Sequence, residues 1–260
     1  MDPNTAFDAL RRQAPLVHCI TNYVAMNIAA NVTLAAGASP AMIHAPEEVA
    51  DFAPIAGALT INIGTLSTPW LGSMTAAAQA ATQVEVPWVL DPVAHFATPY
   101  RTKAARDLLA LKPSVLRGNA SEIIALAGGA GSGKGVDTGD SVTDAETAAR
   151  ALAKGHGCVV AVSGPEDFVT NGAREARIRG GSVMMPKVTA LGCSLTALVG
   201  AYAAVAPNLD ATVAAFTHFA EAGEKAAAGA IGPGSFSAAF LDQLHILQPG
   251  DLDEGRVSWG

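Results

Sequence analysis

Charged residues are scarce in this sequence, and the balance among them is acidic. Only 15% of the 260 residues are Asp, Glu, Lys or Arg, and the formal net charge is −7. No basic stripe is available to neutralise a phosphate backbone, so we expect no nucleic acid partner. A small anionic ligand is still compatible with this composition, because backbone N–H groups at a helix start bind phosphate without net positive charge.

Cysteine is rare, and long apolar runs are missing. Cys19, Cys158 and Cys193 lie too far apart for a disulfide framework or a zinc pattern, which indicates free thiols in a reducing compartment. Gly, Asn or Pro interrupts every hydrophobic stretch before it could span a membrane. The first 15 residues show no basic region followed by an apolar one, so no secretory signal is visible. We therefore expect a cytoplasmic protein with no membrane partner.

Hydrophobic residues make up half of the chain, and short β-like runs alternate with longer helical patterns. The expected strands are 16–21, 41–44, 59–64, 88–93, 114–119 and 158–164, and a hairpin is expected around Asn171-Gly172. The expected helices are 23–36, 69–82, 99–111, 120–127, 141–155, 193–206, 210–228 and 234–245. No repeat or linker divides the sequence, so we expect a single domain over residues 1–260.

This alternation predicts an α/β fold with a mostly parallel sheet and helices on both of its faces. In such folds the ligand site lies beyond the carboxyl ends of the strands. Polar residues stand at several of these ends: Asn22, His44, Asp91, Asn119 and Ser163. The sequence therefore directs the search for a site to this edge of the sheet.

One glycine-rich stretch nearly matches a phosphate-binding loop. Gly128, Gly133 and Lys134 have the G-x-x-x-x-G-K spacing, but Gly135 stands where Ser or Thr is required. The stretch also follows a helical pattern instead of a strand, which favours a surface loop within the domain over a P-loop.

Stronger candidates lie at the strand ends. Asp91 in "VLDPV" is either a turn residue or a metal or water ligand. In "RGNASEI", Asn119 and Glu122 have the spacing of a helix capping box. A cap does not account for Arg117, which with Glu122 could serve a phosphate and its magnesium. Ser163 either begins a turn or places its hydroxyl on a phosphate.

Cys193 differs from the other two cysteines. Cys19 and Cys158 lie inside apolar strands and are interpreted as core residues, and His18, His44 and His95, which share no metal-ligand spacing, as packing or turn residues. Cys193 follows Gly192 at a helix start, where the dipole is expected to lower the thiol pKa. On physical grounds it is either a small core residue or an activated thiol.

Seven stretches together carry a family resemblance. They are "VHCITNYVAMNIAANVTLAAGASPAMIHAPEEV", "LDPVAHFATPYR", "LRGNASEI", "GVDTGDS", "VVAVSGPEDFV", "VTALGCSLTALVGA" and "GPGSFSAAFLD". In this order, over residues 15–245, the chain resembles the hydroxyethylthiazole kinases of thiamine salvage. The resemblance implies a ribokinase-like three-layer α/β/α sandwich. It also implies ATP- and Mg²⁺-dependent phosphorylation of the primary hydroxyl of 4-methyl-5-(2-hydroxyethyl)thiazole by a homotrimer, with the thiazole bound between subunits.

The resemblance also implies a role for particular residues. Asn22 and Met42 would line the thiazole pocket, where Ala190 also approaches the substrate. Arg117 and Ser163 would bind ATP, with Gly192 among the N–H groups facing its phosphates. Asp91 and Glu122 would organise magnesium. Cys193 would face the accepting hydroxyl, either as a base or to orient it.

Two stretches depart from the family pattern. The usual "TGTGC" reads "TALGC" here, and His95-Phe96 replaces a small, glycine-rich segment. Either change is expected to narrow or reshape the pocket. Two alternatives stay open. One is a dehydratase of hydrated nicotinamide nucleotides on the same fold, and the other is a non-catalytic relative that binds thiazole or thiamine, which Ala190 and Leu191 make plausible.

Overall fold

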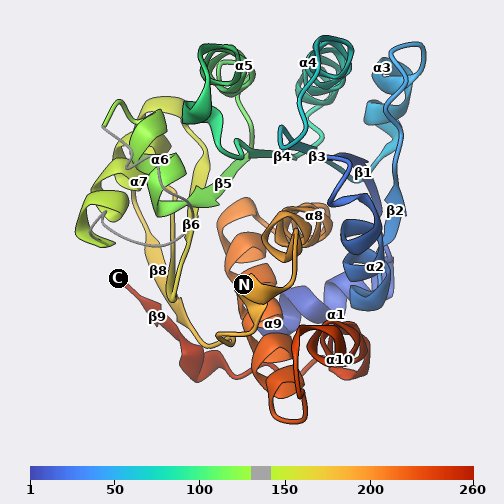
Figure 1. The fold of residues 1–260 in the computed structure, drawn as a ribbon, viewed down its shortest axis with the longest axis vertical. Coiled ribbons are helices and arrows are strands. Elements are labelled where there is room, and N and C mark those ends of the chain that lie inside the picture. Colours follow the sequence, from blue (N-terminus) through green and yellow to red (C-terminus); the bar gives the residue numbers. More distant parts are fainter. Residues whose placement is uncertain (130–141) are drawn as a thin grey trace.

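A nine-stranded sheet runs through the centre of the protein (Figure 1). The structure is a computed structural model, and it describes residues 1–129 and 142–260. The strand order is β2-β1-β3-β4-β5-β6-β7-β8-β9. The first six strands are parallel, and β7, β8 and β9 join antiparallel at one side. The strands are β1 Leu16–Ile20, β2 Ser39–Ala41, β3 Ala58–Asn62, β4 Trp88–Asp91, β5 Val115–Asn119, β6 Val159–Ser163, β7 Glu166–Thr170, β8 Glu175–Arg179 and β9 Val257–Trp259.

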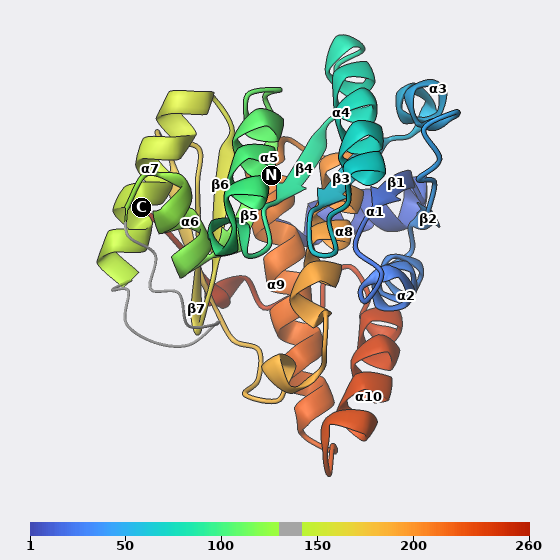
Figure 2. The same ribbon diagram turned by 45° about the horizontal axis from the view of Figure 1, so that its top comes forward.

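Helices cover both faces of this sheet (Figures 1 and 2). One face carries α3 Val49–Phe52, α4 Thr68–Gln83, α5 Pro99–Leu109, α6 Ala120–Leu126 and α7 Val142–His156. The other carries α1 Pro3–Gln13, α2 Met26–Ala36, α8 Leu191–Ala203, α9 Asn208–Ala227 and α10 Pro233–Ile246. The predicted α/β architecture, with a mostly parallel sheet between two helical layers, is thereby confirmed. No helix in the described part of the chain is long and apolar enough to cross a membrane.

Central strands are buried on both sides because each helical layer covers one face. All five residues of β3 are buried. Leu59 and Ile61 belong to the hydrophobic cluster shared with α4 and α5, whereas Val17 and Cys19 of β1 belong to the cluster shared with α8 and α9. Continuous apolar runs are typical of such doubly covered parallel strands. This explains why the sequence shows runs instead of alternation.

Helix α8 lies close against the centre of the sheet. A side chain at Gly200 would collide with Thr60 of β3, so the absence of a side chain allows this approach. Nearly every residue of α8 after Cys193 is buried. Its first turn therefore lies next to the carboxyl ends of the parallel strands.

The predicted helices and strands agree with the structure to within a few residues, apart from the strand expected at 41–44, which spans 39–41. Among the α-helices and strands of the described residues, α1, α3 and β9 were not predicted. Helix α1 does carry sequence signals, since Asp2 caps it and Pro3 occupies its first turn. Strand β9 has only three residues and forms by pairing with β8, a long-range contact that no local pattern reveals.

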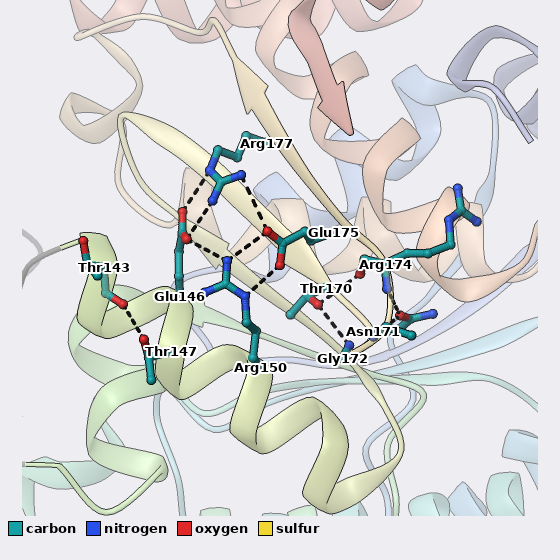
Figure 3. A network of polar contacts seen from close by, with 11 residues as sticks. Thr143, Glu146, Thr147, Arg150, Thr170, Asn171, Gly172, Arg174, Glu175 and Arg177 are labelled. Carbon is teal, nitrogen blue, oxygen red and sulfur yellow. Dashed lines mark hydrogen bonds and ion pairs between the residues drawn. The ribbon is translucent and has the colours of Figure 1, made fainter. Parts of the chain in front are cut away.

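The hairpin expected around Asn171-Gly172 is present as β7 and β8, and an ion-pair network ties it to α7 (Figure 3). Glu146 accepts hydrogen bonds from Arg150 at 2.9 Å and from Arg177 at 2.7 Å. Arg150 also binds Glu175 at 2.7 Å. Both guanidinium groups lie over the ring of Phe168, so the network covers that apolar ring.

Candidate active site

A buried polar cluster lies where the carboxyl ends of the central strands meet the first turn of α8. Asp91 ends β4, Arg117 lies in β5 and Ser163 ends β6. Asn22 follows β1, and Cys193 belongs to α8. These residues come from distant parts of the chain. The structure thus brings together five of the residues that the sequence singled out.

Asp91 lies at the centre of this cluster and is fully buried. Its Oδ2 accepts hydrogen bonds from Thr196 at 2.6 Å, from Asn62 at 2.7 Å and from Arg117 at 3.4 Å. Its Oδ1 is buried and has no hydrogen-bond partner among the described residues. Burial raises the pKa of Asp91 to about 6, although Arg117 and the hydrogen bonds from Thr196 and Asn62 act in the opposite direction.

Arg117 connects Asp91 to the end of β6 and to the start of α8. Its second terminal nitrogen donates to Ser163 Oγ at 2.7 Å. A Cβ at Gly192 would lie 3.4 Å from this guanidinium, so the glycine lets the charged group approach the helix backbone. The Arg117 guanidinium, the Ser163 hydroxyl and the N-terminus of α8 lie together, and this arrangement is suited to binding phosphate.

Glu122 is held by two backbone amides. Its Oε2 accepts from the N–H of Asn119 at 2.8 Å, which completes the predicted capping box at the start of α6. Its Oε1 accepts from the N–H of Ala94 at 2.9 Å, in the loop after β4. The carboxylate is therefore fixed between two loops at the strand ends, and its charge reaches Asp91, whose pKa it raises.

Cys193 is partly buried beside this cluster. Asn22 donates from Nδ2 to the Cys193 sulfur at 3.5 Å and to Asn62 Oδ1 at 2.8 Å. The expected lowering of the thiol pKa is wrong: burial, together with the charge of Asp91, raises the Cys193 pKa to about 11. Desolvation of the thiolate outweighs any stabilisation from the helix start, so the thiol is protonated at neutral pH.

The departure "TALGC" from the family pattern has a structural consequence at the start of α8. Ala190 adopts a left-handed conformation, with φ 58° and ψ 10°. Glycine takes this conformation at no steric cost, whereas a Cβ makes it unfavourable. Leu191 is 2% exposed and belongs to the hydrophobic core, so its bulk adds to the packing beneath α8.

The other departure, His95-Phe96, lies in the loop after β4. His95 is buried, and its Nε2 is 2.9 Å from the backbone carbonyl of Glu122. It therefore packs under the start of α6, in agreement with the interpretation as a packing residue. His18 is also buried, whereas His44 is half-buried and stacks on Trp70 with ring centroids 4.7 Å apart.

Met42 makes no hydrogen bond to the polar cluster through its side chain, which is apolar. It follows the edge strand β2 and packs, partly buried, against the hydrophobic core on the α8 side of the sheet. The P-loop interpretation falls mainly on Gly133, Lys134 and Gly135, which lie outside the described residues. The two remaining cysteines are buried in the core, as expected.

Two members of the cluster were missed in the sequence. Asn62 ends β3, so the rule that selected the other strand ends applies to it as well. Thr196 follows Cys193 by three positions, a spacing that places both on one face of α8. Both donate hydrogen bonds to Asp91. Asn62 lies outside the seven stretches that carry the resemblance, whereas Thr196 lies within "VTALGCSLTALVGA".

Comparison with known proteins agrees with this geometry. Residues 7–249 match the model of the hydroxyethylthiazole kinase family. A hydroxyethylthiazole kinase of Roseobacter denitrificans is 64% identical over 252 residues, which are 97% of this chain and 98% of the relative. One from Rhizobium etli is 64% identical over 254 residues, or 96% and 98% of the two chains.

Solved structures give the same result. A hydroxyethylthiazole kinase from Pyrococcus horikoshii OT3 superimposes with a TM-score of 0.91 at 37% identity, covering 99% of this chain and 98% of that one. A pyridoxal kinase from Staphylococcus aureus shares the fold with a TM-score of 0.63 at 17% identity, over 81% and 88% of the two chains. By family model, sequence identity and fold, this chain belongs to the hydroxyethylthiazole kinase family.

Proposed function

We propose that this protein transfers the γ-phosphoryl group of ATP to the primary hydroxyl of 4-methyl-5-(2-hydroxyethyl)thiazole in thiamine salvage. The observation that carries the proposal is the buried cluster in which Asp91, Arg117 and Cys193 meet at the start of α8. Phosphoryl transfer depends on positioning and on groups that stabilise charge on the transferred phosphoryl oxygens. Family membership identifies the acceptor.

The residues around Asp91 fit a magnesium ion. The buried Asp91 Oδ1 has no partner among the described residues, and Glu122 presents a second carboxylate. No group of three or more His, Cys, Asp or Glu suited to holding a metal occurs in the described ranges. Mg²⁺ keeps several waters and is bound through one or two carboxylates and substrate phosphates, and Asp91 and Glu122 would supply two carboxylates. When bound, the ion would neutralise charge on the phosphates.

Arg117, Ser163 and Gly192 would bind the ATP phosphates. The Arg117 guanidinium already lies between the Ser163 hydroxyl and the backbone at Gly192. Its Nε has no hydrogen-bond partner among the described residues. Backbone N–H groups of the first turn of α8 would add donors where negative charge spreads over the transferred group.

Cys193 would orient the accepting hydroxyl. A thiol with a pKa of about 11 is protonated at neutral pH and is a poor general base. In a loose transition state the hydroxyl oxygen bonds late to phosphorus while the bond to the ADP oxygen is already breaking, so little base strength is required. Orientation by the thiol and by Asn22 is then sufficient, and the hydroxyl proton would pass late in the step to an oxygen of the transferred phosphoryl group.

The thiazole would bind beside Asn22, Met42 and Ala190, between subunits of a homotrimer. Large apolar side chains next to Asn22 support this arrangement, since Tyr23 is 66% and Val24 57% exposed in the single chain. Exposed apolar groups beside a buried polar cluster are typical of a surface that a partner subunit covers. The chain would act as a single domain, in the cytoplasm.

A kinase assay tests the proposal. Purified protein is incubated with ATP and Mg²⁺ and with thiazole and pyrimidine alcohols that differ in the hydroxyalkyl chain. We expect phosphorylation of the hydroxyethylthiazole and its loss in Asp91→Asn. Thiazole binding by calorimetry without ATP turnover would favour the non-catalytic alternative. Turnover of a hydrated nicotinamide nucleotide without phosphorylation of any alcohol would favour the dehydratase.

A further inference from the structure

Arg101, in the first turn of α5, donates hydrogen bonds to the backbone of two loops at the active-site edge of the sheet. Its Nε and Nη2 donate to the carbonyls of Ala94 and Val93, in the loop after β4. Its Nη1 donates to the carbonyl of Gly64 at 3.1 Å, and Nη2 also donates to that of Ile63 at 2.6 Å, in the loop after β3. One guanidinium thus joins both loops.

The loop after β4 is the one that holds Glu122. Ala94 has a left-handed backbone with φ 47°, and its N–H donates to Glu122 Oε1 while its carbonyl accepts from Arg101. The peptide group before Ala94 is therefore bonded to the Glu122 carboxylate and to Arg101, and the peptide group after it is bonded to Arg101. Without Arg101, the unfavourable φ of a non-glycine residue would favour relaxation of this loop.

The loop after β3 provides a rigid anchor for this contact. The N–H of Gly64 donates to Asn62 Oδ1 at 2.9 Å, and any side chain at Gly64 would collide with the amide of Asn22. The position of this loop is thus fixed by the polar cluster itself. Because Arg101 donates hydrogen bonds to both loops, it holds the loop after β4 in place relative to the loop after β3.

The contacts explain why an arginine is needed. Four carbonyls on two loops require several donors in a fixed plane, which a guanidinium provides and a lysine ammonium does not. No carboxylate lies within ion-pair distance of Arg101 among the described residues. Its charge instead faces the carbonyls. Burial lowers the pKa of Arg101, and the charge of Glu122 acts in the opposite direction.

We propose that Arg101 is a positioning residue that, through the N–H of Ala94, holds the Glu122 carboxylate in the orientation needed for the divalent cation. The inference rests on the proposed function for its catalytic consequence, but the effect of Arg101 on cation binding can be measured without turnover. Removal of an outer partner of a metal-binding group typically costs ten- to a hundredfold in metal affinity or activity.

The test compares Arg101→Gln and Arg101→Lys with the control Lys103→Gln, an exposed residue on the same helix. Binding of Mn²⁺ to the protein–ADP complex is followed by the electron paramagnetic resonance of free Mn²⁺. Both Arg101 variants are expected to weaken Mn²⁺ binding by roughly tenfold, since a lysine ammonium does not replace the planar set of guanidinium donors. The control is expected to bind like the unaltered protein.

Turnover gives the second readout. The Arg101 variants should show kcat lowered by roughly tenfold or more and a higher Mg²⁺ requirement, while thiazole affinity by calorimetry stays within about threefold. Unchanged Mn²⁺ affinity in a folded variant would overturn the proposal. So would a loss of thermal stability with unaltered metal binding, which indicates a structural role alone. If the unaltered protein phosphorylates no thiazole, the proposed function fails, but the Mn²⁺ experiment still decides the role of Arg101.

Discussion

The side chain of Cys193 lies among groups that oppose its ionisation. Burial and the nearby carboxylate of Asp91 raise its pKa to about 11, while Arg117 and hydrogen bonds from Asn62 and Asn22 lower it less. The same carboxylate would raise the pKa of an aspartate at position 193 and make it a better base near neutral pH. The residue at this position therefore determines whether the hydroxyl is only oriented or also deprotonated.

This reasoning predicts the behaviour of two variants. Cys193→Ala should lower kcat by roughly tenfold to a hundredfold while thiazole affinity changes little, because orientation is lost only at the reacting atoms. Cys193→Asp should retain or raise kcat. Steady-state kinetics and calorimetry measure both, with Cys158→Ala in the core as control. Unchanged turnover in Cys193→Ala would exclude a role in transfer.

The pKa of Asp91 predicts how kcat/KM declines at acidic pH. Its carboxylate form is the one that binds a cation, and its pKa is about 6, so kcat/KM should fall as the pH drops below about 6. Magnesium favours the carboxylate, so higher Mg²⁺ should move this decline to lower pH. Profiles at limiting and saturating Mg²⁺ measure the shift, and a decline at the same pH in both would contradict the assignment.

The raised pKa of Asp91 also affects stability. Between about pH 4 and 6 the folded chain holds a proton that an unfolded aspartate has already lost. The contribution of Asp91 to the free energy of unfolding is therefore greatest at low pH and decreases as the pH rises through about 6. The site thus keeps a buried carboxylate at a cost to folding, which is common where a charge serves function.

At the scale of elements, the start of α8 is shaped by a strained residue. Ala190→Gly should raise the free energy of unfolding by about 1 kcal/mol, because glycine adopts positive φ without steric cost. Urea unfolding measures the change. Ala204→Gly, at the other end of α8 with φ −69°, is the matched control and should destabilise. A destabilising Ala190→Gly would show that φ 58° costs little here.

The second prediction at this scale concerns the stability that the ion-pair network between α7 and β8 provides (Figure 3). Glu146 has an 11% exposed side chain and two arginine partners, so Glu146→Gln should lower the free energy of unfolding by about 1–2 kcal/mol. Glu166→Gln is the control, since its partner Arg179 has a 77% exposed side chain and the loss should be close to zero. Equal effects in urea unfolding would show that burial is not what strengthens the network.

At the scale of the whole molecule, the proposed trimer makes a prediction about Val24. Sedimentation of the unaltered protein should give three times the chain mass of 26.3 kDa. Val24→Asp should reduce this mass and raise the KM for thiazole, because a charge in an interface core is unfavourable. Ile231→Asp, in the turn between α9 and α10 and 99% exposed, is the control. A trimeric Val24→Asp with unaltered kinetics would place the interface elsewhere.

Most elements and five members of the polar cluster could be predicted from the sequence, for physical reasons that are local. Parallel strands covered on both faces appear as apolar runs, and their polar ends mark one edge of the sheet. Asn62 and Thr196 were missed because their hydrogen bonds to Asp91 join residues that are far apart in the chain. Arg101 was missed because its guanidinium donates, among the described residues, to backbone carbonyls, which carry no sequence signal.

The sequence by itself determined the fold class, the family resemblance and the site edge, because periodicity, strand-end residues and motifs are properties of neighbouring positions. Only the tertiary structure decided the ionisation of Cys193 and the backbone strain at Ala190. The thiol at a helix start was expected to ionise readily, and helix geometry alone supports that expectation. Its pKa is raised because the surrounding strands exclude water and place Asp91 beside it, and desolvation depends on everything packed around a group.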